Sequence, residues 1–241
     1  MRIRLRFTKT GKVRFTSHRD VARMWERAVR RVGLPVAYSE GFSPRAKLHF
    51  GLALSTGHES DAEYLDIDLD QEEIDGSSSL DVDALPVLLT PALPVGIDAT
   101  AAAVIPAGTP SLQQAVTSCS WRIQVVDAQP ADIAAAIDQA LAAPTLMLTR
   151  TRKGSEVTDD VRPYLLDLTE VGPTDSGTAF SAHLATQPRG LRISELLTVL
   201  GPALVEGRVV RKHQWTLRDG ARREPLPLDA TSPSHAAMCA S

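Results

Sequence analysis

The chain has 241 residues, 43% of them hydrophobic and 23% charged, which is typical of a globular protein long enough for two domains of ordinary size. Its two cysteines, Cys119 and Cys239, exclude a disulfide framework and the usual thiolate set of an iron–sulfur cluster, and no apolar run is long enough to span a membrane. The net charge of -3 conceals an asymmetry. Residues 1–50 hold thirteen Lys or Arg and three Asp or Glu, whereas residues 51–100 hold no Lys or Arg and twelve Asp or Glu. This local positive charge indicates a polyanionic partner.

The first predicted element is a strand over residues 2–7, with apolar side chains on one face and arginines on the other. We expect its basic face to be exposed to solvent. The same segment lacks the continuous apolar region of a signal peptide, so we expect a cytoplasmic protein. A turn is predicted at residues 9–12, because Gly11 interrupts the pattern.

A helix is predicted over residues 17–32, with Ser17 as its N-cap, Asp20 as the partner in a capping-box-like arrangement, and Gly33 after its end. Valine, alanine and tryptophan side chains share one face, so the opposite face is expected to present five arginines to solvent: Arg19, Arg23, Arg27, Arg30 and Arg31. Arginine binds phosphate with two parallel hydrogen bonds, which favours contact with a nucleic-acid backbone. Two alternatives are a solvated face and a face that docks the acidic residues 59–83.

Residues 38–44 are predicted to form a loop that carries aromatic and basic side chains. Tyr38 and Phe42 offer surfaces on which unpaired bases stack, and Arg45 and Lys47 supply positive charge. The alternative is that both rings are buried and fix the loop. Together with the helix arginines and this loop, the predicted RNA-binding set includes three more cations of the N-terminal segment: Lys9, Lys12 and Arg14.

His18 is the one candidate catalytic residue. In the first turn of the helix it is suited to act as a general acid or base, or to bind phosphate, while the alternative is a structural histidine bonded to the next loop. His49 and His58 show no metal-ligand spacing with it, so no metal site is expected. Phosphate-binding and dinucleotide-binding glycine motifs are absent from the sequence, and no cofactor is expected.

The remaining pattern predicts two repeats of one α+β arrangement. Strands at residues 46–54, 64–69 and 94–105 and a helix at residues 81–89 give the order βαββαβ, with Asp66 and Asp68 on an exposed strand face. The second half repeats this order with one additional strand. Its predicted helices are residues 130–142 and 193–200, and its predicted strands are residues 121–126, 146–150, 161–171, 179–185 and 208–217. We therefore expect two tandem ferredoxin-like (βαββαβ) domains, at residues 1–108 and 117–219, and a disordered tail at residues 220–241.

Three short motifs resemble a bacterial family known as radical-SAM-associated, or radical-SAM-linked, proteins. They are K-x-G-x-x-R-F-x-S-H-x-D at residues 9–20, the segment at residues 27–44, and S-x-x-E-Y-x-D at residues 60–66. The resemblance implies a domain of unknown function that is fused to, or encoded beside, a B12-binding radical-SAM protein. The tandem ferredoxin-like arrangement with a basic first helix is also similar to Cas6-type RNA-processing endonucleases, although a fold does not fix a function.

The charge pattern, the loop and the resemblance together favour a non-catalytic RNA-binding accessory module in tRNA or rRNA modification or maturation. One alternative is a metal-independent endoribonuclease that uses His18. Another is a protein adaptor for a radical-SAM partner enzyme, in which residues 9–47 bind protein instead of RNA.

Overall fold

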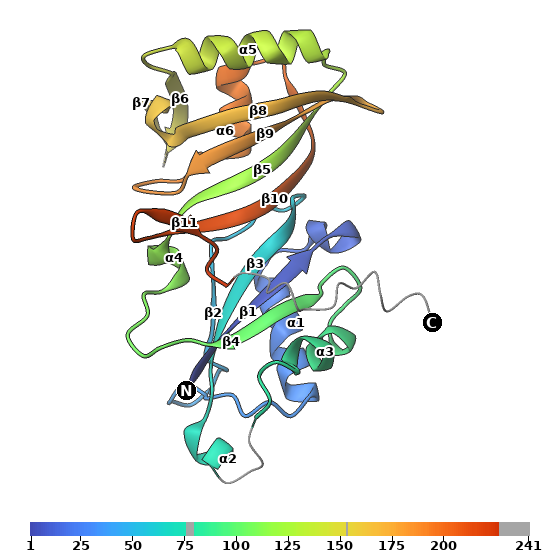
Figure 1. Ribbon diagram of the computed structural model, residues 1–241, viewed down its shortest axis with the longest axis vertical. Helices are drawn as coiled ribbons and strands as arrows, with labels where there is room; N and C mark the ends of the chain where they lie inside the picture. The colour runs from blue at the N-terminus through green and yellow to red at the C-terminus, as the bar shows by residue number, and fades with distance from the viewer. Residues whose placement is uncertain (76–79, 153, 227–241) are drawn as a thin grey trace. The chain divides into compact units, whose positions relative to one another are not determined.

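The computed structural model of the protein describes residues 1–75, 80–152 and 154–226 (Figure 1). The chain is divided into two compact units: unit 1 contains residues 1–115 and the segment from 223 onward, and unit 2 contains residues 116–222. Each unit combines helices with an antiparallel sheet, which agrees with the predicted mixture of helix and strand. Within the described residues, no helix has both the length and the apolar character needed to cross a membrane.

The sheet of unit 1 has the strand order β4-β1-β3, and β2 pairs with the edge of β3 opposite β1. The strands are β1 (Arg2–Lys9), β2 (Leu48–Phe50), β3 (Glu59–Asp68) and β4 (Ala99–Val104), and each of these pairings is antiparallel. The strand predicted at residues 46–54 is therefore shorter than expected, and the one predicted at residues 94–105 begins later.

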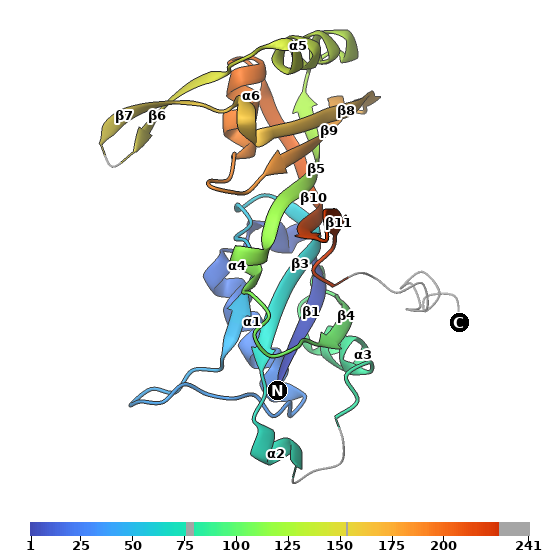
Figure 2. The same ribbon diagram turned by 60° about the vertical axis from the view of Figure 1, so that its left-hand side comes forward.

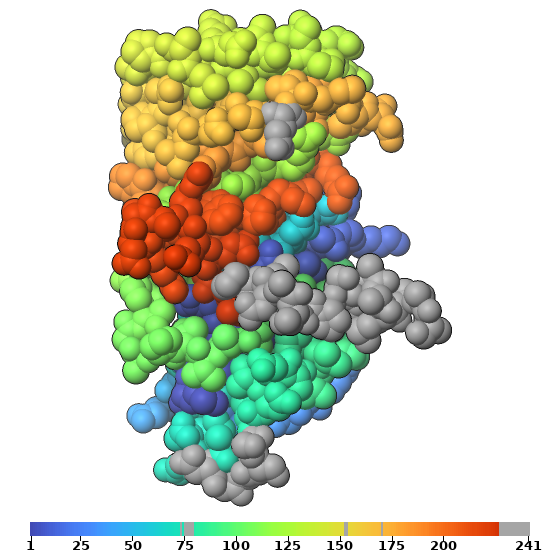
Figure 3. Space-filling view, in the orientation of Figure 1, coloured from blue at the N-terminus to red at the C-terminus, as the bar shows by residue number. Residues whose placement is uncertain are grey.

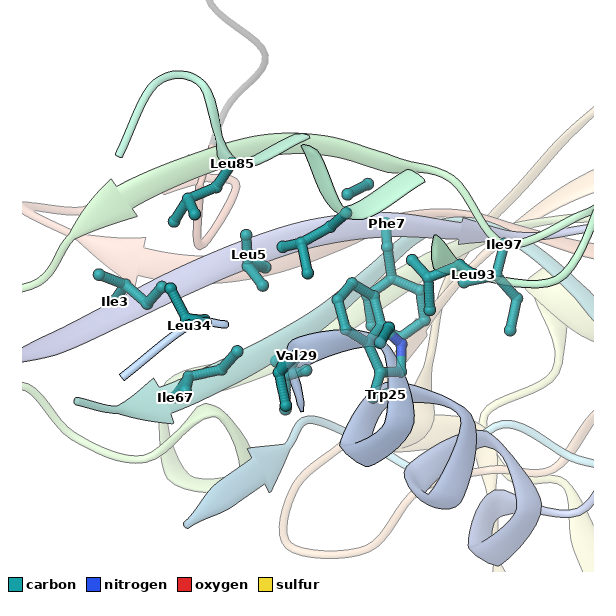
Figure 4. Close-up of a cluster of buried hydrophobic side chains, with 14 of the residues drawn as sticks. Ile3, Leu5, Phe7, Trp25, Val29, Leu34, Ile67, Leu85, Leu93 and Ile97 are labelled. Carbon is teal, nitrogen blue, oxygen red and sulfur yellow. The ribbon is translucent and has the colours of Figure 1, made fainter. Parts of the chain in front are cut away.

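One face of this sheet carries the hydrophobic core of unit 1 (Figure 4). Helix α1 (His18–Arg31) places the fully buried Trp25 against Phe7 of β1, with ring centroids 5.0 Å apart in an edge-to-face arrangement. Burial of a side chain as large as Phe or Leu contributes about 1.5–3 kcal/mol. This packing fixes which face of α1 points away from the sheet.

Short helices complete unit 1. They are η1 (Gly11–Phe15), α2 (Gln71–Asp75), α3 (Leu85–Leu89), η2 (Thr90–Ala92) and α4 (Leu112–Ala115). The helix predicted at residues 81–89 is present only from Leu85, because residues 81–84 form a turn in which the Asp81 carboxylate accepts hydrogen bonds from the backbone of residues 83 and 84. Pro86 then occupies the first turn of α3, where its missing N–H costs nothing.

The opposite face of the sheet corrects the prediction of an exposed basic surface on β1. Arg4 and Arg6 are 0% and 5% exposed. In the register of β1 and β3, Arg4 lies opposite Asp66, which is itself buried and not on an exposed strand face as predicted. Arg6 lies 3.7 Å from the carboxylate of Glu224. The alternation of side chains had correctly separated an apolar face of β1 from a basic face. However, Arg4 and Arg6 on the basic face are buried, as are the apolar side chains on the other face.

Residues 223–226 also correct the predicted tail. β11 (Ala221–Arg223) is a short strand, Glu224 pairs with Arg6, and Leu226 packs with Tyr64 and Leu112 in a small apolar cluster. These residues of the predicted disordered segment therefore have defined contacts. The rest of that segment, residues 227–241, lies outside the described residues.

The main sheet of unit 2 has the strand order β10-β5-β9-β8, with antiparallel pairs throughout. Its strands are β5 (Val116–Val126), β8 (Leu165–Thr174), β9 (Gly177–Ala185) and β10 (Val205–Arg218). Their order along the chain agrees with the four corresponding predicted strands. Cys119 is buried within β5.

The helices of unit 2 are α5 (Pro130–Ala142) and α6 (Ile193–Leu200), as predicted, with a short η3 (Arg162–Tyr164). Ile133 and Ile137 of α5 belong to the same buried cluster as Phe180 of β9. The strand predicted at residues 146–150 does not join the main sheet. Instead β6 (Met147–Arg152) pairs with β7 (Ser155–Asp160) in a separate hairpin.

Candidate nucleic-acid interface

The start of α1 is fixed by a capping pair, as predicted. The backbone N–H of Asp20 donates to Ser17 Oγ at 3.2 Å, and the Ser17 hydroxyl donates to the Asp20 carboxylate at 2.7 Å. The hydrogen bond from Ser17, with the positive charge of Arg23, lowers the pKa of Asp20 below its ordinary value. An N-cap of this kind stabilises a helix by about 1 kcal/mol. The capping pair therefore fixes the residue at which α1 begins.

All five arginines predicted on the outer face of α1 are exposed, because Val21, Trp25, Ala28 and Val29 occupy the buried face. Four of these arginines recur every fourth residue and rise about 6 Å per step along the helix. We call this set the arginine row: Arg19, Arg23, Arg27 and Arg31. The Arg23 guanidinium lies 3.3 Å from the Asp20 carboxylate, but an exposed pair of this kind contributes little energy.

The thirteen cations of residues 1–50 divide into two groups. Five have contacts within the fold: Arg2, Arg4, Arg6, Lys9 and Arg14. The other eight are exposed, and they include the arginine row: Lys12, Arg19, Arg23, Arg27, Arg30, Arg31, Arg45 and Lys47. Three acidic residues of β3 therefore pair with cations outside α1: Glu59 with Arg14, Asp66 with Arg4 and Asp68 with Arg2.

Lys9 is a correction to the predicted RNA-binding set. It is 3% exposed, and its ammonium donates to the backbone carbonyl oxygen of Thr16 at 3.0 Å and to that of Arg14 at 3.4 Å. It ties the end of β1 to the turn before α1. Arg14 is half-buried and lies 3.2 Å from the buried carboxylate of Glu59, so its charge is also largely used within the fold.

The predicted loop after α1 is a projecting finger, which we define as residues 36–48 (Figure 2). Its base is held by a bridge between Val36 and Leu69 and by a hydrogen bond from Lys47 N to Ala37 O at 2.9 Å. Farther out, the N–H of Ser39 donates to Arg45 O at 2.9 Å, and Arg45 N donates to Ser39 Oγ at 3.0 Å. Hydrogen bonds thus hold the two arms together beyond the base, where Val36, Ala46 and Leu48 pack against the core of unit 1.

The two rings of the finger are exposed, which contradicts the alternative that they are buried plugs. Phe42 at the tip is 109% exposed relative to its reference state, and Tyr38 is 45% exposed. Gly41 has a φ of 121°, a conformation that other residues rarely adopt, so the tip requires glycine before Phe42. The ring of Phe42 is therefore accessible to a binding partner.

His18 is exposed at the first position of α1, and its ring meets the edge of Phe50 with centroids 5.2 Å apart. Beside it lies a cavity of about 20 Å³, lined in part by Lys9 and Glu63, which has room for about one water molecule. In the part of the chain that the structure describes, this ring contact is the one interaction of the His18 side chain. The geometry does not bring a proton-transfer partner to it.

The histidines do not assemble into a metal site within the described residues, where no group of three or more potential ligands occurs. His49 lies instead 3.1 Å from the carboxylate of Asp68, which also accepts from Arg2. Burial raises the pKa of Asp68, but the hydrogen bonds from Arg2 and His49 outweigh burial, so this pKa is lowered overall. Asp68 is therefore part of a small charge cluster near the base of the finger.

Two features of this surface were missed by the sequence reasoning. Phe15 is 62% exposed, with the Arg14 guanidinium 4.6 Å above its ring. A cavity of about 490 Å³ also lies at the base of the finger, lined by residues from five separate stretches of the chain. The direct succession of Arg14 and Phe15 in the sequence could have indicated the cation–ring contact. Nothing local in the sequence signals the cavity, because its walls come from distant parts of unit 1.

A protein-family model with the description "Uncharacterized protein conserved in bacteria (DUF2344)" matches residues 2–196. None of the curated proteins compared with the chain matches it. Among solved structures, a chain of the "Crystal Structure of a Cbf5-Nop10-Gar1 Complex" is similar with a TM-score of 0.48 and 9% identity. The match covers 88% of this chain and 48% of that chain, so this chain spans about half of the other's length.

Proposed function

The chain belongs to the DUF2344 family of bacterial proteins, and we propose that it is an RNA-binding accessory protein that presents tRNA or rRNA to an enzyme of RNA modification or maturation. The observation that carries this proposal is the division of the N-terminal charge. Five cations are used within the fold, whereas eight remain exposed on α1, the preceding turn and the finger. A surface of this kind provides the phosphate contacts that dominate nucleic-acid affinity.

The arrangement of these groups favours RNA with unpaired bases over a featureless polyanion. The arginine row gives bidentate phosphate binders at regular spacing, and the chain passes from Arg31 into the finger within a few residues. Phe42 and Tyr38 then offer aromatic faces beside Arg45 and Lys47. Single-stranded RNA is bound by the combination of basic groups that track the backbone and rings that stack on bases.

We further propose that each unit is a ferredoxin-like domain. The approximate domain boundaries in this proposal are those expected from the sequence, residues 1–108 and 117–219. The support is the strand order. Counting strands along the chain, both sheets have the order 4-1-3-2, if β6 and β7 are treated as an inserted hairpin in unit 2. This is the order of the split βαβ arrangement.

The proposed partner enzyme follows from the sequence resemblance alone: a B12-binding radical-SAM protein. In this proposal the present chain supplies RNA binding, and the partner supplies the chemistry. An adaptor that binds only the partner would use the same finger, because an exposed Phe42 also suits a hydrophobic pocket of a protein. The RNA experiment below separates these two possibilities.

The test is filter binding of the purified full chain to total tRNA and to rRNA fragments, between about 50 and 200 mM salt. We expect binding that weakens steeply as salt rises, and a loss of at least tenfold in the double variant Arg23→Glu, Arg27→Glu. The matched control is Arg208→Glu, Arg218→Glu, which reverses two exposed arginines of β10. A flat salt response, or an equal loss in the control, would contradict the proposal.

The same RNA, incubated with the protein without Mg²⁺ and examined on a denaturing gel, tests the endoribonuclease alternative. We expect the RNA to remain intact. Cleavage that disappears in His18→Ala would instead assign a catalytic role to His18, and cleavage that persists in this variant would place the catalyst elsewhere.

A further inference from the structure

The cavity at the base of the finger, which we call the root pocket, has a volume of about 490 Å³. This volume is within the range of about 300–1,000 Å³ that is typical of small-molecule sites. Its walls include Arg2, Lys47, Asp68, Leu69 and the segment at residues 105–109. In the space-filling view, the dark-blue start of the chain lies at the surface close to the green segment that follows β4 (Figure 3).

The walls of the root pocket are fixed by the sheet of unit 1. The pocket lies at the end of the sheet where β1 begins and β3 and β4 end. Ile105 N donates to Arg2 O at 3.0 Å, and Asp68 N donates to Lys47 O at 3.1 Å. The turn that closes the pocket is held by Thr109, whose hydroxyl donates to Pro106 O at 2.7 Å. The pocket is therefore bounded by hydrogen-bonded backbone on each of these sides.

The lining combines an apolar part with a basic part. Ala37, Ile105 and Pro106 supply apolar surface, whereas Leu69 also lines the pocket but is only 4% exposed. Lys47 is exposed, and the Arg2 side chain is 38% exposed although it also pairs with Asp68. The two cations exceed the single carboxylate of Asp68 by one positive charge. Such a lining suits a ligand with a flat apolar part and an anionic part.

We propose that the root pocket binds one nucleotide of the RNA, with the base against Ile105 and Pro106 and the phosphate at Lys47 and Arg2. Ala37 and Lys47 line the pocket, and they also form the hydrogen-bonded pair at the base of the finger. Tyr38 is the next residue from Ala37 toward the tip of the finger. A base that Tyr38 displaces from its stack would therefore emerge beside the pocket. Unstacking costs least for a base that is already unpaired. This inference rests on the proposed function.

The experiment is an NMR or calorimetric titration of the full chain with the 5′-monophosphates and the nucleosides of A, G, C and U. We expect saturable binding of at least one monophosphate and at least tenfold weaker binding of its nucleoside. Ala107→Trp, which fills the pocket from an exposed turn, and Lys47→Glu should each weaken binding at least tenfold. The matched controls are Val95→Trp, at a 98% exposed position, and Lys212→Glu, at an exposed position of β10, and both should bind like the parent protein.

The inference is overturned if no monophosphate gives saturable binding, if the nucleoside binds as tightly, or if both pocket variants bind like the parent. Lys47→Glu carries the test alone if urea unfolding shows that Ala107→Trp does not fold. Failure of the proposed function gives a different result, because the monophosphate would then still bind in a pocket-dependent way while filter binding of tRNA and rRNA fails.

Discussion

Arg4 of β1 and Asp66 of β3 face each other across an antiparallel strand pair and form a two-point ion pair inside unit 1. Arg4 Nε lies 2.7 Å from one carboxylate oxygen of Asp66, and the terminal nitrogen lies 2.8 Å from the other. The two residues are 0% and 2% exposed. This pair shows that part of the N-terminal charge asymmetry is structural, since a basic strand and an acidic strand neutralise each other within the sheet.

Removal of one partner of this pair is expected to destabilise the protein. Arg4→Met and Asp66→Leu each leave a buried charge uncompensated, which costs about 3–5 kcal/mol, whereas the double variant loses much less. Urea unfolding of the three variants gives the coupling between the two side chains. Arg27→Met is the control, because its guanidinium is exposed, and a change within about 0.5 kcal/mol is expected. Additive single losses would contradict the prediction.

Replacement of the α1 cap is expected to cost less. Ser17→Ala removes the acceptor for the Asp20 N–H and should lower the free energy of unfolding by about 1 kcal/mol, while Ser17→Thr keeps the hydroxyl as acceptor and donor and should restore most of it. Urea unfolding followed by far-UV circular dichroism measures both. Ser43→Ala, in the exposed tip of the finger, should change nothing. An equal effect at Ser43 would show that the loss at Ser17 is not due to capping.

The tip of the finger is expected to act in binding and not in folding. Phe42→Ala should weaken RNA binding by about 1–3 kcal/mol, the contribution of one base stacked on an aromatic ring, and Phe42→Trp should preserve it. The unfolding free energy should stay the same because the ring is fully exposed. Leu88→Ala, at a 53% exposed position of α3, is the control for a general loss of apolar surface. Unchanged RNA binding in Phe42→Ala would remove the finger tip from the interface.

Each arginine of the row is expected to contribute one phosphate contact. Arg27→Gln should weaken binding to all RNA sequences alike and should reduce the slope of log affinity against log salt by about one. The measurement is the salt series used for the parent protein. Arg208→Gln, on β10, should leave the slope unchanged. A loss of affinity without a change in slope would indicate that Arg27 acts by a route other than phosphate contact.

The stability of unit 2 is expected to fall in mildly acidic solution because of His183. Its ring accepts at Nδ1 from Arg222 at 2.6 Å, so the neutral ring carries its proton on Nε2, 2.7 Å from Ser118 Oγ. Burial, and then the charge of Arg222, lowers the pKa of His183 below 6.5, although Asp167 opposes this. The unfolded chain thus binds the proton more readily, and the contribution is complete above pH 6.5 and declines as the pH falls toward the folded-state pKa.

Urea unfolding across this pH range checks the His183 prediction. His183→Gln should flatten the decline because glutamine does not titrate. His213→Gln, which changes a half-exposed histidine of β10, serves as the control and should retain it. The prediction fails if the parent protein and His183→Gln lose stability in parallel.

Much of α1 could be predicted from the sequence, because its cap, its period and its terminating glycine are all local signals. The exposure of the arginine row followed from the same period. The burial of Arg4 and Lys9 could not be predicted in this way. Alternation in a strand shows that two faces exist, but the partner of Arg4 lies on β3, far along the chain, and Lys9 is covered by the turn that follows it. The root pocket was missed for the same reason.

The contact between Arg6 and Glu224 has a consequence for the order in which the protein is made. Unit 1 is discontinuous in the sequence, so Glu224 leaves the ribosome only after the whole of unit 2 has been synthesised. Until then the guanidinium of Arg6 lacks this partner, and the cluster of Tyr64 and Leu112 lacks Leu226. Domains usually fold as they emerge, N-terminal first. Here the first unit to emerge is the last to acquire all of its contacts, and a fragment that stops at residue 115 is an incomplete version of it.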